Sequence, residues 1–220
     1  RSLLDLNQAN PLVLNYLTQN AIWWIEYADL DGLRVDTYSY NDKEGIAKWT
    51  KAIMDEYPHF NIMGEVWLNQ SAQVSYWQKD SPISAIQSYN TYLPTVMDFP
   101  LFNAIGEAFR AAPSWDKGMM QLYDNLANDF LYKDINNLLI FAENHDTARL
   151  NHVYPKIADY KLIISMLATA RGIPQLYYGS EIGMAGDKSK GDGHIRQDFP
   201  GGWEGDAQNA FTAAGRTAIQ

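Results

Sequence analysis

The sequence predicts an α/β fold in which helices alternate with parallel strands. Apolar residues recur at helical spacing in several segments, and short runs rich in apolar and β-branched residues lie between them. Parallel strands joined by helical crossovers produce this order of segments. With 46% hydrophobic and 20% charged residues, the composition is that of a folded domain.

The first predicted helix, residues 12–30, follows Asn10 and Pro11, a pair that suits a helix start. Its leucine, alanine and tryptophan side chains recur every three or four residues. The helix leads into a short strand at 31–36, which reads DGLRVD. A helix followed by a strand is half of the repeating unit of a parallel sheet.

A second helix and strand follow directly. The helix at 41–58 takes Asn41 or Asp42 as its N-terminal cap and stops at Pro58. The strand at 60–67 reads FNIMGEVW. The same reasoning gives the remaining elements, which are a strand at 95–102, helices at 103–112 and 115–132, a strand at 136–146, a helix at 160–171 and a strand at 173–179.

Five strands are therefore expected, whereas a (β/α)₈ barrel requires eight strands and usually about 250 residues. The residues alone leave two architectures open, an open doubly wound sheet and part of a barrel. No Pro/Ser linker or repeat divides the chain, so residues 1–220 are interpreted as one domain, with a long irregular segment from residue 180 onward. The glycine-rich motifs of nucleotide-binding folds are absent.

The charge balance excludes several classes of partner. Lys and Arg number 17 against 26 Asp and Glu, a net charge of −9, so no basic surface is available for nucleic acid. The longest apolar stretches, such as 162–170, fall short of the roughly 20 residues that cross a bilayer.

Aromatic residues make up 13% of the chain, and their flat apolar rings suit sugars as ligands.

Three predicted strands end in acidic side chains. Arg34 and Asp36 lie two residues apart, so both point to the same face of their strand, and the guanidinium favours the ionised carboxylate. Glu65 ends the next strand among small and apolar neighbours beside Trp67, and such surroundings favour a protonated acid. Asp146 follows His145 just after a third apolar strand.

Each of these patterns has a structural alternative, namely an ion pair, a capping glutamate or a satisfied His–Asp pair. Their joint occurrence at the C-terminal ends of strands favours a catalytic site, because barrel active sites form at that face. One carboxylate kept ionised and one kept protonated are what glycosidic cleavage needs: Asp36 would attack the anomeric carbon, and Glu65 would protonate the leaving oxygen. A structure that placed the three acids apart would refute this interpretation.

The segments DGLRVD, GEVW and FAENHD resemble three catalytic segments of the α-amylase family, glycoside hydrolase family 13, and arrive in the family's order. LLDLN at 3–7, VMDFPLF at 96–102 and GIPQLYYGSE at 172–181 resemble further segments. The resemblance implies that residues 1–220 form the C-terminal part of a (β/α)₈ TIM-barrel catalytic domain, roughly strands four to eight. Strands one to three and the C-terminal β domain would be missing.

The resemblance also implies a role for each site residue. Asp36 would be the nucleophile, Glu65 the acid/base and Asp146 the aspartate that holds the distorted sugar. Arg34 would position Asp36, and His145 would bind the same sugar unit. Trp67 and Tyr38 are expected to contact substrate.

The expected reaction is retaining hydrolysis of α-1,4-glucosidic bonds in starch-type glucans, with α-glucan transglycosylation or non-catalytic carbohydrate binding as alternatives. GDGHIRQDFPGGW at 191–203 resembles the bacterial neopullulanase and cyclomaltodextrinase branch. Ser39 and Tyr40 stand where many α-amylases have Lys-His, so this segment does not itself support a structural calcium ion, and the chemistry requires no cofactor. The resemblance favours a periplasmic or extracellular location. An open barrel would leave unpaired edge strands and so favour self-association, and it would leave the fragment alone inactive.

Overall fold

The computed structural model describes residues 5–112, 114–201 and 203–206. Leu3 and Leu4 of the LLDLN segment, and Gly202 of the GDGHIRQDFPGGW segment, lie outside the described residues. The chain divides into two compact units, and each is described by itself. Unit 1 comprises Arg1–Ala104, Leu122–Leu139 and Arg171–Ile173, and unit 2 comprises Ile105–Gln121, Ile140–Ala170 and Pro174–Gln220.

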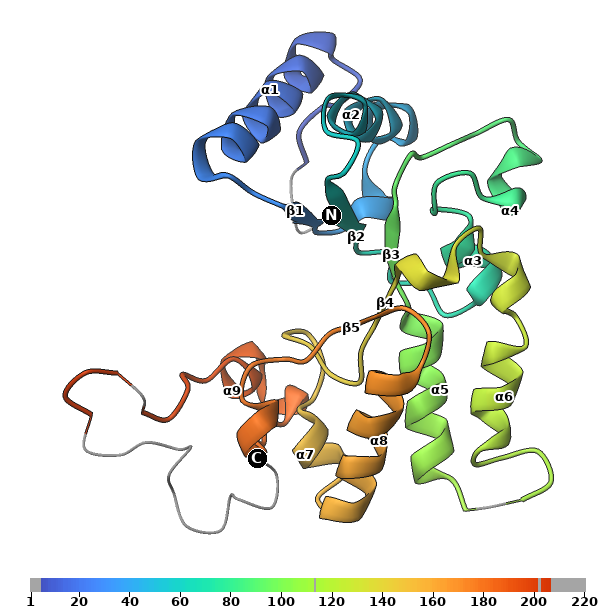
Figure 1. The fold of residues 1–220 in the computed structure, drawn as a ribbon, viewed down its shortest axis with the longest axis vertical. Helices are drawn as coiled ribbons and strands as arrows, with labels where there is room; N and C mark the ends of the chain where they lie inside the picture. The colour runs from blue at the N-terminus through green and yellow to red at the C-terminus, as the bar shows by residue number, and fades with distance from the viewer. Residues whose placement is uncertain (1–4, 113, 202, 207–220) are drawn as a thin grey trace. The chain divides into compact units, whose positions relative to one another are not determined.

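Five short strands form one sheet whose strand order follows the chain, and β1 to β4 pair in parallel (Figure 1). The strands are β1 Gly32–Val35, β2 Asn61–Gly64, β3 Thr95–Met97, β4 Leu138–Ile140 and β5 Ile173–Pro174. Val35 pairs with Gly64, Gly64 with Val96, and Val96 with Leu138. This row of partners fixes which residues emerge together at the C-terminal edge of the strands in unit 1. Five strands in chain order, with β1 to β4 paired in parallel, confirm the expected topology.

Helices connect the strands, as the alternating pattern predicts. The α-helices are α1 Pro11–Ala28, α2 Lys43–Glu56, α3 Ser71–Ser75, α4 Pro82–Ala85, α5 Phe99–Arg110, α6 Met120–Leu126, α7 Leu150–Val153, α8 Ile157–Thr169 and α9 Asp192–Ile195. The 3₁₀ turns are η1 Tyr38–Tyr40, η2 Asp129–Leu131, η3 Ile135–Asn137, η4 Ser180–Ile182 and η5 Lys188–Lys190.

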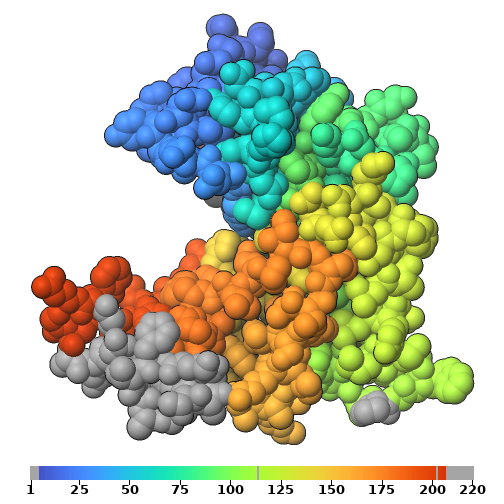
Figure 2. Space-filling view, viewed as in Figure 1, coloured from blue at the N-terminus to red at the C-terminus, as the bar shows by residue number. Residues whose placement is uncertain are grey.

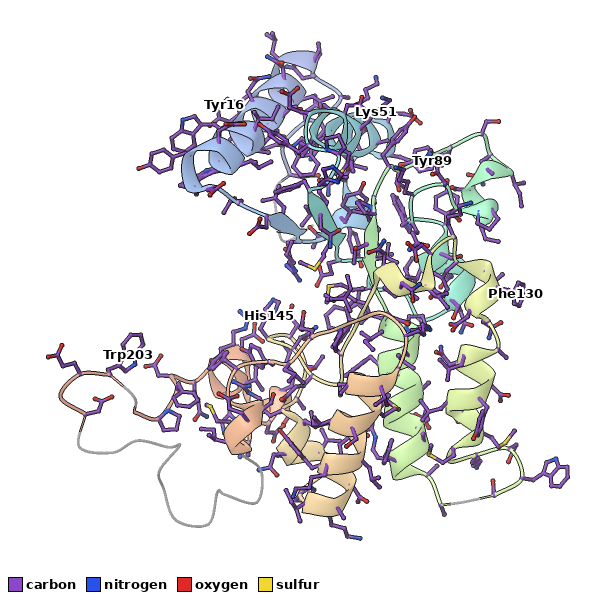
Figure 3. The ribbon with its side chains drawn as sticks, in the orientation of Figure 1. Tyr16, Lys51, Tyr89, Phe130, His145 and Trp203 are labelled. Atoms are coloured by element: carbon purple, nitrogen blue, oxygen red, sulfur yellow. The ribbon has the colours of Figure 1, made fainter. Side chains whose placement is uncertain are left out.

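The first two helices begin where the sequence predicts. The side chain of Asn10 accepts a hydrogen bond from the Leu12 N–H at 2.9 Å, with Pro11 in the first turn of α1. Asp42 caps α2 by accepting from the Gly45 N–H at 2.7 Å. In unit 1, α1 packs against α2, and its outer side lies at the surface in the space-filling view (Figure 2). Tyr16 projects from that outer side (Figure 3).

Several predicted boundaries are wrong. The strand expected at 95–102 ends at Met97, because Asp98 caps a helix: its carboxylate accepts the Leu101 N–H at 3.0 Å, and Pro100 lies in the first turn of α5. The helix expected at 115–132 is only α6 followed by η2. The strands expected at 136–146 and 173–179 are limited to three and two residues. The four short helices α3, α4, α7 and α9 were not expected, because four or five residues carry too little periodicity.

Apolar side chains fill the interior of each unit. In unit 1 the fully buried residues include Ile53, Ile62, Leu93, Val96 and Leu138, which come from α2, the strands and the loop before β3. In unit 2 they include Ile105, Ile140, Phe141, Leu150, Ile163 and Leu167. None of the helices in the described ranges has the length and hydrophobicity needed to span a membrane.

Candidate active site

Two acidic residues follow paired positions on adjacent parallel strands of unit 1. Val35 ends β1 and Gly64 ends β2, and the two residues are register partners. Asp36 and Glu65 come next, and the Glu65 N–H donates to the Val35 carbonyl at 2.9 Å. The two carboxylates therefore emerge side by side at the C-terminal edge of the sheet, where barrel enzymes carry their active sites.

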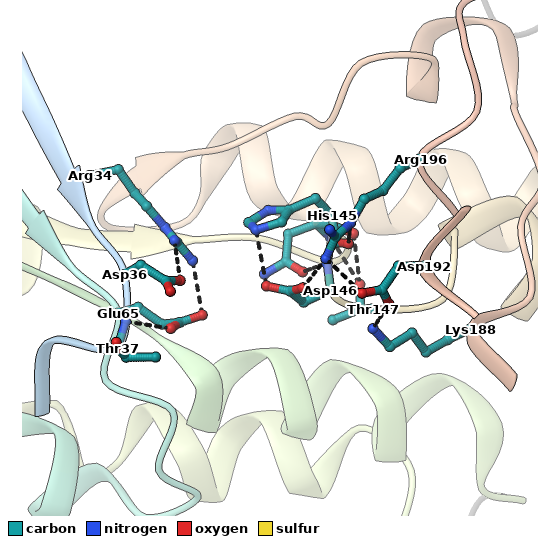
Figure 4. Close-up of polar contacts among 11 residues, drawn as sticks. Arg34, Asp36, Thr37, Glu65, His145, Asp146, Thr147, Lys188, Asp192 and Arg196 are labelled. Atoms are coloured by element: carbon teal, nitrogen blue, oxygen red, sulfur yellow. Dashed lines mark hydrogen bonds and ion pairs between the residues drawn. The ribbon is translucent and has the colours of Figure 1, made fainter. Parts of the chain in front are cut away.

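Arg34 binds both carboxylates at once. Its Nη1 donates to Asp36 Oδ1 at 2.5 Å, and its Nη2 donates to Glu65 Oε1 at 2.9 Å (Figure 4). The Asp36 side chain is 67% exposed, whereas the Glu65 side chain is 6% exposed. One guanidinium thus joins a carboxylate that is open to a ligand with one that lies inside the protein.

The surroundings of Glu65 are more polar than the sequence indicates. Its neighbours Gly64 and Val66 are buried, as expected. In addition to Arg34, however, the Thr37 N–H donates to Glu65 Oε2 at 2.8 Å. Each carboxylate oxygen therefore accepts a hydrogen bond, so two polar contacts accompany the small and apolar neighbours that the sequence shows.

Thr37 adopts a backbone conformation that sequence reasoning did not foresee. Its φ and ψ of 46° and 37° lie in the left-handed region, which costs a β-branched residue free energy. This conformation turns its N–H toward Glu65. The strained residue, Thr37, therefore follows Asp36 directly and contacts the Glu65 carboxylate.

Tyr38 is a core residue in this structure. Its side chain is fully buried, and its hydroxyl pairs with the Thr50 hydroxyl at 2.7 Å. Burial raises the pKa of the Tyr38 phenol, with the Thr50 hydrogen bond offsetting part of the effect. A side chain so placed contacts no ligand, which corrects the expectation that Tyr38 binds substrate.

Trp67, by contrast, is accessible. Its residue is 41% exposed, and its ring stacks on Phe99 with centroids 4.6 Å apart and an interplanar angle of 17°. Stacking on Phe99 fixes the orientation of the indole. The ring provides the flat apolar surface that was expected of it.

In unit 2, His145 and Asp146 lie in a second hydrogen-bonded group. His145 Nε2 is 3.0 Å from Asp146 Oδ2, and Arg196 Nη2 is 2.6 Å from Asp146 Oδ1. The Arg196 Nε also donates to the His145 carbonyl at 2.8 Å, and the Asn144 side chain accepts the Asp146 N–H at 2.8 Å. Arg196 comes from the irregular C-terminal segment, so no periodic signal could have linked it to Asp146.

Glu143 lies directly before this group and is buried. It accepts the Leu150 N–H at 2.6 Å and a hydrogen bond from the Ser180 hydroxyl. Burial raises the pKa of the Glu143 carboxyl, and these two hydrogen bonds offset part of the effect. Sequence reasoning missed Glu143 because an acid inside an apolar run gives no sign of its partners.

The structure brings Arg34, Asp36 and Glu65 together in unit 1, and His145 with Asp146 in unit 2. The meeting of the two groups on one sugar stays a prediction. In the described part of the chain, no cluster of three or more His, Asp or Glu side chains is arranged to hold a metal ion.

Parallel strands with acidic side chains at their C-terminal ends define a protein of the barrel-enzyme class. The family model of the α-amylase catalytic domain matches residues 1–215, and this chain belongs to that family. The expected fold class, part of a (β/α)₈ barrel, is confirmed by solved relatives. The α-amylase of Geobacillus thermoleovorans, solved with acarbose, aligns with a TM-score of 0.73 and 31% identity over 89% of this chain and 42% of that chain.

Two curated relatives illustrate the similarity in sequence. The α-amylase 3 of Dictyoglomus thermophilum is 29% identical over 221 residues, or 94% of this chain and 39% of that protein. A cyclomaltodextrinase of Thermoanaerobacter pseudethanolicus is 30% identical over 183 residues, or 81% of this chain and 29% of that protein. The chain therefore spans less than half the length of each of these relatives.

Proposed function

We propose that the protein hydrolyses α-1,4-glucosidic bonds of starch-type glucans and retains the configuration of the anomeric carbon. The observation that carries the proposal is the joint contact of Arg34 with Asp36 and Glu65 at the C-terminal ends of adjacent strands. Membership of the α-amylase family, and relatives named α-amylase and cyclomaltodextrinase, support the choice of α-glucan as substrate.

The two carboxylates supply the complete chemistry in two steps. In the first, Asp36 attacks the anomeric carbon while Glu65 protonates the leaving oxygen, so the glycosidic bond breaks and a glycosyl–Asp36 ester forms. In the second, Glu65 takes a proton from water, and the water oxygen displaces Asp36 from the anomeric carbon. Because nucleophile and proton both come from side chains, we propose that the reaction uses no cofactor.

The remaining site residues would bind the sugar. Arg34 keeps the nucleophile and the acid in one geometry, and Trp67 offers an apolar face to a glucose ring. His145 and Asp146 would hydrogen-bond hydroxyl groups of the unit that is cleaved. Acarbose is bound by the Geobacillus relative, so it is the natural probe for this site.

The test is Asp36→Asn in the full-length protein, assayed on maltooligosaccharides. We expect kcat to fall at least about 1,000-fold, as loss of a nucleophile does in other hydrolases. The matched control is Asp55→Asn, which makes the same change on the exposed side of α2 and should leave kcat unchanged. Activity of Asp36→Asn close to that of the wild type would remove Asp36 as nucleophile.

Product analysis separates the alternatives. NMR of the first product should show the α-anomer, and the β-anomer would indicate inversion instead. Products longer than the substrate at high acceptor concentration would assign transglycosylation. Acarbose binding without any turnover by the wild type would assign a non-catalytic carbohydrate-binding protein.

A further inference from the structure

Arg196 connects the irregular C-terminal segment of unit 2 to two consecutive residues of the candidate site. Its Nε donates to the His145 carbonyl at 2.8 Å, and its Nη2 donates to Asp146 Oδ1 at 2.6 Å (Figure 4). His145 Nε2 lies 3.0 Å from the other oxygen, Asp146 Oδ2. Both oxygens of Asp146 are thus held by nitrogen atoms, so the side chain has one preferred rotamer.

A second arginine fixes the chain directly before Arg196. The Arg149 side chain is fully buried, with its Cζ 3.8 Å from the centre of the Tyr177 ring and 4.6 Å from that of Tyr178. Its Nε donates to the carbonyl of Ile195 at 3.0 Å. Because Ile195 precedes Arg196, this buried contact sets where the Arg196 side chain begins.

An acid on α9 aligns the Arg196 guanidinium from the other side. Asp192 Oδ2 is 3.2 Å from Arg196 Nη2, and Asp192 is itself bound by Lys188. The Lys188 hydrogen bond and the charge of Arg196 hold the pKa of Asp192 below its usual range. The Arg196 side chain is 40% exposed, and ion pairs with that exposure contribute little to folding stability. Stability alone therefore gives no reason for so many contacts to converge on Arg196.

We propose that Arg196 is a positioning residue for Asp146: it holds the Asp146 carboxylate and the His145 backbone in the orientation in which they bind the reacting sugar. This inference rests on the proposed function. Without Arg196, Asp146 can rotate about its side-chain bonds, and the His145 carbonyl loses a donor. A displacement of about 1 Å at a reacting centre can cost about 100-fold in rate.

The experiment uses the full-length enzyme with maltohexaose as substrate. The variants are Arg196→Ala, Arg196→Lys, Asp146→Asn and the double variant Arg196→Ala/Asp146→Asn. Arg196→Ala should lower kcat by about 10- to 100-fold, with a much smaller change in KM. Free guanidinium ions should restore part of this kcat, and Arg196→Lys should lie between Arg196→Ala and the wild type. Arg110→Gln also removes one positive charge from unit 2 and should leave kcat unchanged.

The double variant distinguishes positioning from a merely structural role. If Arg196 acts through Asp146, adding Arg196→Ala to Asp146→Asn should change kcat by less than about twofold, since the two effects are coupled. Equal losses in both backgrounds, or no loss in Arg196→Ala, would overturn the inference and leave the proposed function intact. Wild-type activity in Asp146→Asn would also overturn the inference, because Arg196 would then have no site residue to position, and it would leave hydrolysis by Asp36 and Glu65 intact. Circular dichroism of Arg196→Lys checks that the fold survives the change at this position.

Discussion

Replacing Arg171 by leucine would remove the cation that lies between two carboxylates in unit 1. Its Nη1 donates to Asp98 at 2.7 Å, and its Nε and Nη2 donate to the two oxygens of Asp129 at 2.9 and 2.6 Å. The side chains of Asp98 and Arg171 are 1% and 11% exposed. Leucine would leave Asp98 buried without its cation.

The size of the effect follows from this burial. Breaking a buried ion pair by removing one partner costs about 3–5 kcal/mol, because the other charge stays in a medium that solvates it poorly. For a chain of this length, each kcal/mol lowers the unfolding temperature by about 2–4 °C. We therefore expect Arg171→Leu to lower the unfolding temperature by about 6–20 °C. The matched control is Lys51→Leu, which breaks an exposed ion pair with Asp55 and should change the unfolding temperature little.

The pH dependence provides the decisive assay. Burial raises the pKa of Asp98, and Arg171 offsets part of that effect, so Arg171→Leu should raise this pKa further. The folded variant then binds more protons than the unfolded chain, and its stability increases as the pH falls. Thermal unfolding should show a smaller deficit at pH 5 than at pH 7, and adding Asp98→Asn should recover much of the loss. A deficit below about 1 kcal/mol, or one that grows in acid, would refute the reasoning.

Two further predictions concern close contacts beside the candidate site. Gly64→Ala would place a Cβ 2.6 Å from Leu93 Cδ2 and 2.9 Å from Tyr38 Cγ. We expect thermal unfolding to show a loss of about 1–3 kcal/mol in stability. We also expect a lower kcat, because Glu65 is the next residue. Wild-type values of both would contradict this. Ser180→Ala would remove the hydroxyl that donates a hydrogen bond to the buried Glu143 carboxylate. We expect a loss of about 1–3 kcal/mol in stability at pH 7. That loss should shrink toward pH 5 as the carboxylate takes up a proton, and a loss independent of pH would count against the contact.

The strand order and the positions of the acids at strand ends could be predicted from the sequence. Alternating periodicities give the order of the elements, and a period of two places Arg34 and Asp36 on one face. The contact between Arg34 and Glu65 could not be predicted, because it depends on the register of β1 against β2. Local patterns carry no information on register between strands that are joined by a helix.

Other errors have a different physical origin. Tyr38 was expected at the site, yet the left-handed turn at Thr37 directs the chain so that the ring packs into the core. The strand predicted at 95–102 was too long, because the capping effect of Asp98 overrides the apolar run around it. Arg196 and Arg149 lie in or beside irregular segments, where only tertiary contacts reveal a role.

Sharing one guanidinium between Asp36 and Glu65 makes these two positions epistatic. When residue 36 loses its charge, Arg34 is left with Glu65 as its only anionic partner in the pair, so the hydrogen bonding of Glu65 is expected to change as well. Kinetics of a single substitution at either position would therefore report on both residues. Directed evolution that varies one position at a time would miss productive combinations, and libraries should vary residues 34, 36 and 65 jointly.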